Sequence, residues 1–236
     1  MADILVISPH PDDAEIHAGG LIAAHIRMRR SVVICDATAG ELGSRGTQAG
    51  RAQEAEAAAQ ELGITTREQL GLPDGYLNAS DLQQRAIIIS AIRRHRPAVI
   101  VALSEHARHP DHIALAGLVR GAVKAAALHK LPAPGDHPAW GGARLWFVEA
   151  ELPLVATLLV PLTAEDWGRK MRAVRCYGSQ LHQPGSTAPV TSISQPGFVE
   201  WIEARGRERG HHAAAPYAEA LMGPEAARIS DLCSVS

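Results

Sequence analysis

Two short segments of the chain carry histidine and aspartate at close spacing. The first is His10-Pro11-Asp12-Asp13, and the second is His109-Pro110-Asp111-His112. Imidazole nitrogens and carboxylate oxygens are the donors of catalytic zinc sites, which use three protein ligands and leave a fourth position open for water. These residue types therefore indicate metal-assisted hydrolysis, provided that the fold brings the two segments together.

Each of the two segments would supply part of such a site. His10, Asp13 and His112 can supply the three ligands, and Asp12 then stays free as a general base. Zinc lowers the pKa of a bound water to about 7, which leaves a proton for such a base to remove. Either segment alone is explained as well by a turn before a helix that Asp caps. Two of them at neighbouring strand ends are much less frequent by chance, so we favour the metal site.

The remaining polar residues of the second segment fit a role beside the ion. His109 lies three residues before His112, where its ring can polarise a substrate carbonyl or stabilise a tetrahedral oxyanion. Asp111 is expected to orient His109 and to favour the protonated form of its ring.

The surrounding sequence alternates between strand and helix patterns. Strands are predicted from short apolar or β-branched runs at 4–8, 31–37, 69–72 and 98–103. Helices are predicted from apolar periodicity or from Ala- and Glu-rich composition at 13–29, 50–62, 82–95 and 111–128. This alternation predicts an α/β class, a Rossmann-like, doubly wound, mostly parallel sheet between two helical layers. In the common strand order 3-2-1-4-5, strands one and four meet at the switch point, so both segments would face one cleft.

The second half of the chain has a weaker pattern. Strands are predicted at 145–150 and 154–160, helices at 165–177 and 198–209, and a loop or lid at 180–196. The prolines between 132 and 138 mark a loop, and we expect one domain over residues 1–236.

Composition excludes several classes of function. A formal net charge of −2 gives no electrostatic case for binding nucleic acid or an anionic membrane. Cys35, Cys176 and Cys233 lie far apart, as reduced thiols do, and form no C-x-x-C pair. The chain shows neither a leader peptide nor a long apolar segment, so we expect a cytoplasmic protein.

Further segments complete a family pattern. They are Gly19-Gly20, the loop 40–47 (Gly-Glu-Leu-Gly-Ser-Arg-Gly-Thr), Leu72-Pro73-Asp74-Gly75, Tyr177-Gly178-Ser179-Gln180 and Tyr217-Ala218-Glu219. Together with the two histidine–aspartate segments, they resemble the PIG-L/LmbE-like deacetylases, zinc hydrolases of N-acetylglucosamine conjugates with a Rossmann-like fold. The loop 40–47 and the Ser-Gln segment are similar to the bacterial subgroup that deacetylates N-acetylglucosaminyl-malate in bacillithiol synthesis.

The resemblance implies the same roles for the two segments and adds substrate contacts. Arg51 matches an arginine that contacts substrate, although an exposed helix charge explains it too. Arg45 and Arg108 are expected at the cleft, where guanidinium groups suit the carboxylates of malate. Arg108 would serve equally as a structural partner of an aspartate. Glu41 is expected either to bind sugar hydroxyls or to close its loop.

Two positions depart from the pattern. Some relatives carry tyrosine where this chain has Phe198, so a hydroxyl near the oxyanion would be missing. His17 replaces a small residue one helical turn beyond Asp13, and we expect it to pack beside the ion without binding it.

The expected reaction is hydrolysis of an N-acetyl group to acetate and a free amine, in a homotrimer or homohexamer. Malate, inositol, a chito-oligosaccharide or an antibiotic precursor all stay open as the remainder of the substrate. Iron, cobalt or manganese would suit the same ligands as zinc. A nucleotide-binding module is disfavoured because the first predicted strand lacks a following G-x-G-x-x-G. A non-catalytic metal protein would not need Asp12.

Overall fold

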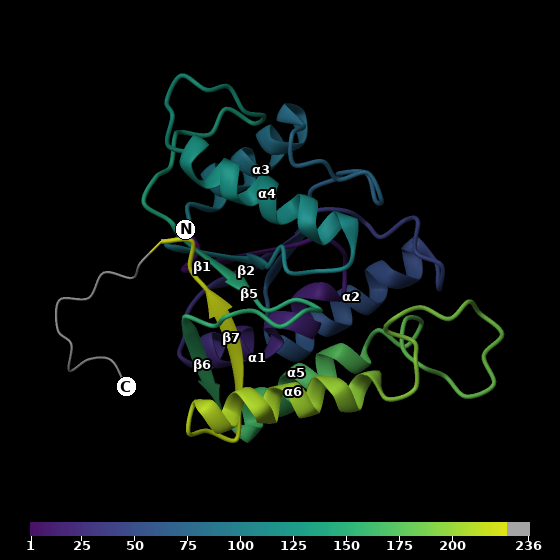
Figure 1. Ribbon diagram of the computed structural model, residues 1–236. Coiled ribbons are helices and arrows are strands. Elements are labelled where there is room, and N and C mark those ends of the chain that lie inside the picture. The colour runs from purple at the N-terminus through teal and green to yellow at the C-terminus, as the bar shows by residue number, and fades with distance from the viewer. Residues whose placement is uncertain (226–236) are drawn as a thin grey trace.

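The computed structural model describes residues 1–225, in which seven strands form one sheet in the order β3-β2-β1-β4-β5-β7-β6 (Figure 1). The strands are β1 (Ile4–Ser8), β2 (Val32–Asp36), β3 (Thr66–Gln69), β4 (Val99–Leu103), β5 (Arg144–Val148), β6 (Leu158–Leu162) and β7 (Tyr217–Met222). β1 to β5 are parallel in the predicted order, and β7 runs antiparallel to both β5 and β6. The α/β class and the switch point between β1 and β4 are confirmed.

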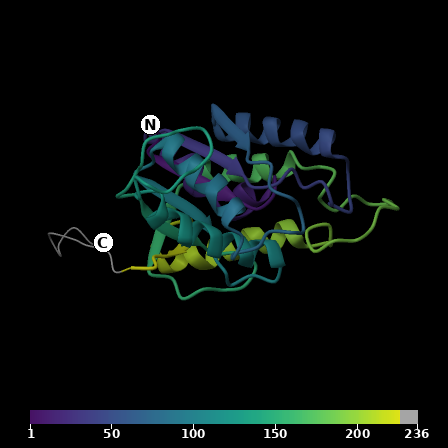
Figure 2. The same cartoon turned by 90° about the horizontal axis from the view of Figure 1, so that it is seen from above.

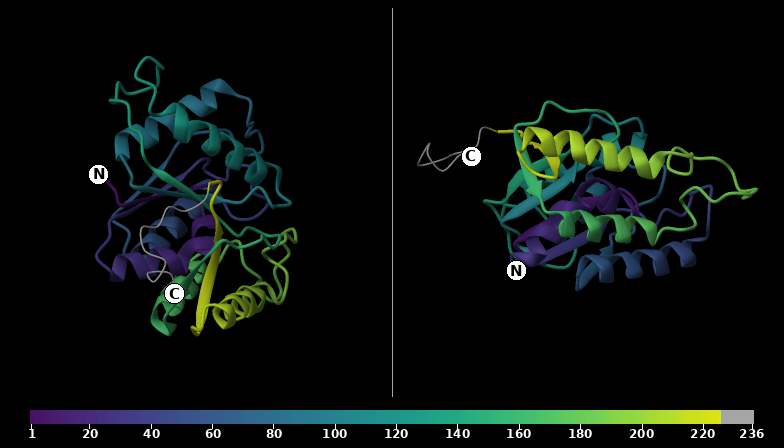
Figure 3. Two further views of the ribbon diagram at one scale, coloured as in Figure 1. Left: turned by 60° about the vertical axis from the view of Figure 1, so that its left-hand side comes forward. Right: turned by 90° about the horizontal axis from the view of Figure 1, so that it is seen from below.

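Helices cover both faces of this sheet. They are α1 (Asp13–Arg27), α2 (Gln48–Leu62), α3 (Leu82–His95), α4 (Pro110–Ala125), α5 (Ala164–Arg175) and α6 (Phe198–His212). α3 and α4 lie over one face, and α1, α2 and α5 over the other, with α6 beside β7 (Figures 1 and 2). Seen from below, α6, α5 and α2 lie side by side (Figure 3).

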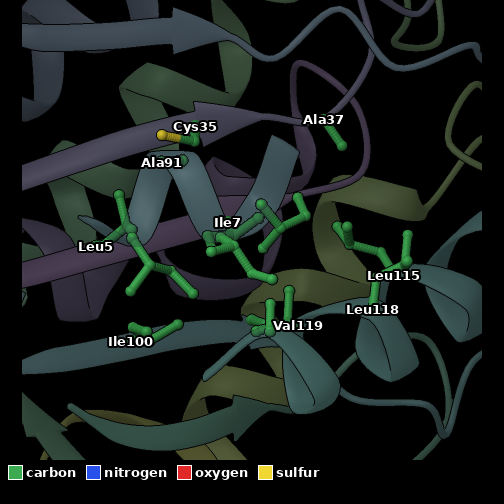
Figure 4. Packing of buried hydrophobic residues seen from close by; sticks show 14 of the residues in the cluster. Leu5, Ile7, Cys35, Ala37, Ala91, Ile100, Leu115, Leu118 and Val119 are labelled. Carbon is green, nitrogen blue, oxygen red and sulfur yellow. The ribbon is translucent and has the colours of Figure 1, made fainter. Parts of the chain in front are cut away.

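Strand β1 shows how the sequence builds this arrangement. Its residues are apolar on both sides, as expected for a central parallel strand that helices cover twice. Leu5 and Ile7 point into the cluster under α3 and α4, which also contains Leu115 and Val119 (Figure 4). Ile4 and Val6, which alternate with them, enter the cluster under α1 and α2.

Three strand predictions are corrected. β3 covers 66–69 and not 69–72, because the edge strand is polar (Thr-Arg-Glu-Gln) and carries no apolar signal. β6 begins at Leu158 and not at 154, since Val155 is 81% exposed in a loop. β7 was not predicted at all. Its Ala-Glu-Ala-Leu-Met composition favours a helix, and only its burial between β5 and β6 makes it a strand.

Two smaller points follow from the described residues. Cys35 and Cys176 are free thiols, as predicted, while Cys233 and the predicted domain end at 236 lie outside the described residues. Within residues 1–225 no helix combines the length and the apolar character that crossing a bilayer requires.

A buried carboxylate on β7 joins three elements. Glu219 is 5% exposed and accepts hydrogen bonds from the backbone N–H groups of Gly20, at 2.9 Å, and Leu21, at 2.6 Å. Lys170 of α5 donates its ammonium to the same carboxylate at 2.7 Å. The close approach requires glycine, because a Cβ at Gly20 would lie 2.4 Å from Leu162. Glu219 thus fastens α1 and α5 to the outer part of the sheet.

Replacing Glu219 with Gln is expected to lower the free energy of unfolding by about 3 to 5 kcal/mol, because the buried Lys170 ammonium then lacks its counter-charge. The double variant Glu219→Gln, Lys170→Met should recover most of that loss, since it removes both charges. Urea unfolding measures both effects, with Lys124→Met at an exposed pair as the control. Equal stability of the single and double variants would show that the charge pairing does not matter.

Candidate metal centre

The two histidine–aspartate segments lie at neighbouring strand ends. Residues 9–12 join β1 to α1, and residues 104–109 join β4 to α4. β1 and β4 are paired in parallel, with Ile7 opposite Ala102, so both segments leave the sheet at the same edge. The sheet topology therefore brings together two segments that are remote in the sequence, as predicted from the strand order.

Three buried donors converge at this edge. His10, Asp13 and His112 are 8%, 5% and 5% exposed, and one ligand atom from each lies within 4.8 Å of the others. Asp13 Oδ2 lies 3.1 Å from His10 Nδ1 and 3.2 Å from His112 Nε2. The spatial grouping is as expected, and the role of these residues as metal ligands stays a prediction.

The donor set and its surroundings fit a divalent cation. Two imidazoles and one carboxylate are a ligand set of catalytic zinc sites, and they suit other divalent first-row metals too. Burial lowers the pKa of His10, but hydrogen bonds to three surrounding carboxylates outweigh burial and raise it to about 12. Similarly, the charge of Asp13 overcomes the effect of burial and raises the pKa of His112 to about 10. The same negative charge that favours protonated imidazoles would favour a bound cation.

Asp12 is held beside this group in a strained conformation. Its φ is 111°, a region that non-glycine residues rarely adopt, and its side chain is 6% exposed. Although it occupies the N-cap position of α1, its carboxylate makes no cap hydrogen bond and instead binds Arg51 at 3.0 Å. Burial and the charge of Asp13 raise the pKa of Asp12 to about 7, against the effect of Arg51. Strain of this kind concentrates at functional sites.

Arg51 is not the exposed helix charge that its sequence position allowed. It is 6% exposed and donates to Pro11 O at 2.9 Å and to Gly40 O at 3.1 Å, in addition to Asp12. A Cβ at Gly40 would lie 2.2 Å from its guanidinium. Both terminal nitrogens of Arg51 thus donate to protein groups, which makes Arg51 a support for Asp12, and its expected substrate contact stays a prediction.

His109 and Asp111 are linked differently from the expectation. The Asp111 backbone N–H, and not its carboxylate, binds His109 Nδ1, at 3.2 Å. The carboxylate accepts from Gly75 N at 2.7 Å and Leu77 N at 3.2 Å and lies 3.3 Å from His10 Nε2. Burial and the nearby imidazoles lower the pKa of His109, which overrides the Asp111 charge. Asp111 therefore orients His10, and because His109 Nδ1 accepts a hydrogen bond, Nε2 is the ring nitrogen that can donate one.

The other predicted substrate contacts separate into two groups. Arg45 is buried and donates to carbonyl oxygens of the loop between α5 and α6, including those of Ser179 at 3.0 Å and Pro189 at 2.9 Å. Glu41 accepts from Asp74 N at 2.9 Å, so it closes its loop. The contact of Glu41 matches the loop-closing alternative, and the substrate contact expected of Arg45 stays a prediction. Arg108, next to His109, is exposed.

Of the two positions that depart from the family pattern, His17 lies near the candidate metal centre and Phe198 does not. His17 is 4% exposed, with Nδ1 3.1 Å from Glu149 O and Nε2 4.0 Å from Asp13 Oδ1. It therefore packs beside Asp13, as expected. Phe198 stacks on Trp201 at 5.6 Å in the apolar cluster with α5, so its place is in packing.

Two carboxylates of the site were missed by the sequence analysis. Asp74 Oδ1 lies 3.2 Å from His10 Nε2, and Glu151 Oε1 lies 3.0 Å from His112 Nδ1. Asp74 follows β3 and Glu151 follows β5, so both leave the sheet at the edge that carries the histidines. Searching every strand's carboxyl end for acidic residues would have found them.

A second group of possible ligands is explained without a metal. Glu68 Oε1 is shared by His95 Nε2 at 2.6 Å, Arg94 Nη2 at 2.9 Å and Cys35 Sγ at 3.1 Å. The 2.6 Å separation is that of a direct hydrogen bond, and the Arg94 cation already neutralises the carboxylate. This group ties β2 and β3 to the end of α3.

Replacing Glu151 with Gln is expected to weaken zinc affinity about 10- to 100-fold, because the carboxylate orients the His112 ring. Competition with a chromophoric chelator measures the affinity. Asp13→Ala, which removes the carboxylate shared by both imidazoles, should abolish tight binding, and Glu105→Gln at an exposed ion pair should change nothing. Unchanged affinity in Glu151→Gln would refute the orienting role.

Comparison with known proteins adds a family model and curated relatives. The model described as PIG-L, GlcNAc-PI de-N-acetylase, matches residues 5–123. A probable N-acetyl-alpha-D-glucosaminyl L-malate deacetylase 2 of Bacillus subtilis is 36% identical over 46% of this chain and 55% of its own length. A 1D-myo-inositol 2-acetamido-2-deoxy-alpha-D-glucopyranoside deacetylase of Thermomonospora curvata is 29% identical over 61% of this chain and 58% of its own. The chain therefore spans less than two thirds of the length of these relatives.

Solved structures share the fold. A conserved protein of Thermus thermophilus has a TM-score of 0.86 at 35% identity, covering 98% of both chains. An N,N'-diacetylchitobiose deacetylase of Pyrococcus horikoshii gives 0.79 at 21% identity, over 94% of this chain and 83% of its own. A 4-carboxy-2-hydroxymuconate hydratase of Pseudomonas putida gives 0.78 at 21% identity, over 98% and 100%. At such identities the last two show the fold alone.

The family match spans the part of the chain that builds the centre. Residues 5–123 run from β1 into α4 and include both histidine–aspartate segments. The chain belongs to the PIG-L family of GlcNAc-PI de-N-acetylases.

Proposed function

We propose that the protein hydrolyses the N-acetyl group of an N-acetylglucosaminyl conjugate, with zinc held by His10, Asp13 and His112. The observation that carries this proposal is the convergence of three buried donors with a fourth carboxylate, Asp12, held apart from them. A site that only bound a metal would have no use for a strained, separately supported base.

The chain's own residues divide the proposed reaction between them. A divalent cation at the three donors would polarise the acetyl carbonyl and lower the pKa of water. Asp12 accepts the proton of the attacking water, and Arg51 fixes the direction of the carboxylate. Asp12 then passes the proton to the departing nitrogen, which leaves as the amine while acetate is formed. His109 donates its Nε2–H to the oxygen on which negative charge develops.

The relatives support the sugar part of the proposed substrate. The two curated relatives carry names of deacetylases for acetylated glucosamine, joined to malate in one and to inositol in the other. The shared part is thus the acetylated amino sugar. We propose malate as the aglycone, in bacillithiol biosynthesis, because exposed Arg108 beside His109 can bind a carboxylate. Inositol, a chito-oligosaccharide and an antibiotic precursor are the alternatives.

The remaining expectations concern the location, the assembly and the alternative functions of the protein. The cytoplasmic location and a trimeric or hexameric assembly stay predictions. A nucleotide-binding module has no support at the end of β1, where phosphate would meet buried carboxylates of Asp12 and Asp13. A hydratase shares the fold, so an assay must detect acetate and primary amine together to show hydrolysis of an amide.

Asp12→Asn is expected to lower kcat about 100- to 10,000-fold, because the amide cannot accept the proton of water. Zinc content, measured by atomic emission, should match the unsubstituted protein. Acetate and primary amine are assayed with an N-acetylglucosaminyl-malate substrate, with and without a chelator. Turnover at the original rate would remove Asp12 from the mechanism, and no turnover of any N-acetylglucosaminyl conjugate would refute the proposed function.

Arg108→Ala is expected to raise KM for N-acetylglucosaminyl-malate about 10- to 100-fold, since a charge-assisted hydrogen bond is lost. KM for the uncharged inositol conjugate should change little. Arg120→Ala, at an exposed arginine paired with Glu105, is the matched control. An equal effect of Arg108→Ala on both conjugates would contradict malate recognition by this residue.

A further inference from the structure

Two arginines of α6 reach the carboxyl end of β5. Arg205 donates to the carbonyl oxygen of Ala150 and, at 3.2 Å, to that of Glu149. Arg209 instead donates to the Glu149 carboxylate, with 3.1 Å between Nε and Oε2. Both arginine side chains are 16% exposed and that of Glu149 is 3% exposed. α6 thus holds the backbone of residues 149–150 through the hydrogen bonds of Arg205, whose Nε also lies 3.7 Å from Glu149 Oε2, and the Glu149 side chain through Arg209.

The segment that Arg205 holds contacts one candidate ligand, His112, directly and a second, Asp13, through His17. Glu151 Oε1 lies 3.0 Å from His112 Nδ1. His17 Nδ1 lies 3.1 Å from the carbonyl oxygen of Glu149, and its Nε2 lies 4.0 Å from Asp13 Oδ1. A shift of the backbone at 149–151 would therefore disturb both His112 and Asp13.

The charges around Arg205 have no room for a ligand of their own. Arg205 and Arg209 line a cavity together with Glu149, Lys170 and Glu219, and its volume is about 10 Å³. That volume admits one water molecule at most. The two buried arginines therefore bind protein groups and not a ligand. The protein groups that Arg205 binds lie next to the candidate metal centre.

We propose that Arg205 is a positioning residue of the metal centre, which fixes segment 149–151 so that Glu151 and His17 hold His112 and Asp13 for the ion. This inference rests on the metal site of the proposed function. Arginine suits the task because its planar fork reaches two neighbouring carbonyl oxygens at once, which a lysine ammonium does less well. Outer contacts of this kind tune the affinity of ligand sets.

The competing explanation is that the α6 arginines only stabilise the fold. Arg209 allows the two explanations to be separated, because its side chain is equally little exposed and both arginines pair with the Glu149 carboxylate, whereas the hydrogen bonds to the carbonyl oxygens of residues 149 and 150 come from Arg205. If stability alone matters, Arg205→Met and Arg209→Met should behave alike. If positioning matters, only the loss of Arg205 should change the metal site beyond its effect on stability.

The test uses the full chain with Arg205→Met, Arg205→Lys and Arg209→Met, and with Arg207→Met at an exposed arginine of the same helix as control. Zinc affinity is measured by chelator competition, the Co²⁺-loaded form by its visible spectrum, and stability by urea unfolding. Arg205→Met should weaken zinc binding about 10-fold or more and change the Co²⁺ spectrum. Arg209→Met should lower stability with less than a threefold change in affinity, and Arg207→Met should match the original protein.

Two further results would contradict the positioning role of Arg205. Equal affinities for Arg205→Met and the original protein, or equal losses in Arg205→Met and Arg209→Met, would overturn the proposal. If Arg205→Met does not fold, Arg205→Lys is the deciding variant. A zinc affinity below that of the original protein would support the positioning role, and an unchanged affinity would contradict it. At saturating zinc, kcat should fall while KM stays. If zinc affinity falls as expected but no N-acetylglucosaminyl conjugate is hydrolysed, the positioning role stands and the proposed reaction fails.

Discussion

The crowding of carboxylates around two imidazoles is the constraint on which the rest of the site depends. Asp13, Asp74 and Asp111 all approach His10, and Glu151 approaches His112, at an edge where solvent is largely excluded. Buried like charges repel strongly and are tolerated only where opposite charge or hydrogen-bond donors compensate them. Backbone N–H groups and imidazoles supply part of that compensation, and a divalent cation at the three donors would supply the rest.

The same constraint explains why the surrounding loops are fastened so firmly. Arg51 occupies both of its terminal nitrogens with Asp12 and two carbonyl oxygens, which keeps one carboxylate away from the others. Asp111 accepts two backbone N–H groups of the loop after β3, so that loop and the start of α4 are fixed together. A base with a fixed direction and ligands with fixed rings need no rearrangement when charge develops during a reaction. Preorganisation here comes from several strand ends at once.

The sequence predicted the parts of this arrangement that depend on local pattern and topology. His10, Asp13 and His112 were found because each follows a clear apolar strand, and the switch-point rule places those strands side by side. The roles of Arg45 and Arg51 were beyond such reasoning, since a helix or loop position does not reveal which carbonyl oxygens lie nearby. Strand β7 was not predicted for a related reason, because its burial in the sheet overrides the helical preference of its residues. Asp74 and Glu151 lay within reach of the topological rule, which had been applied only where histidine was present.

The residues with proposed roles differ in exposure from the side chains around them, and this difference affects which aglycones the site can distinguish. Apart from the exposed His109, the groups to which the proposed reaction assigns a role are buried and mostly engaged with protein partners, so under that proposal they would distinguish little beyond the acetyl group. Discrimination among aglycones therefore falls to side chains at the rim. Arg108 is exposed there, and Leu42 and Tyr76, in loops that contact Asp74 and Asp111 through the backbone of residues 42 and 75, are 62% and 71% exposed. An exposed guanidinium can bind a carboxylate, and exposed apolar side chains can contact the remainder of an aglycone. Under the proposed function, relatives named for a malate and for an inositol conjugate would differ at such side chains while the buried chemistry stays the same.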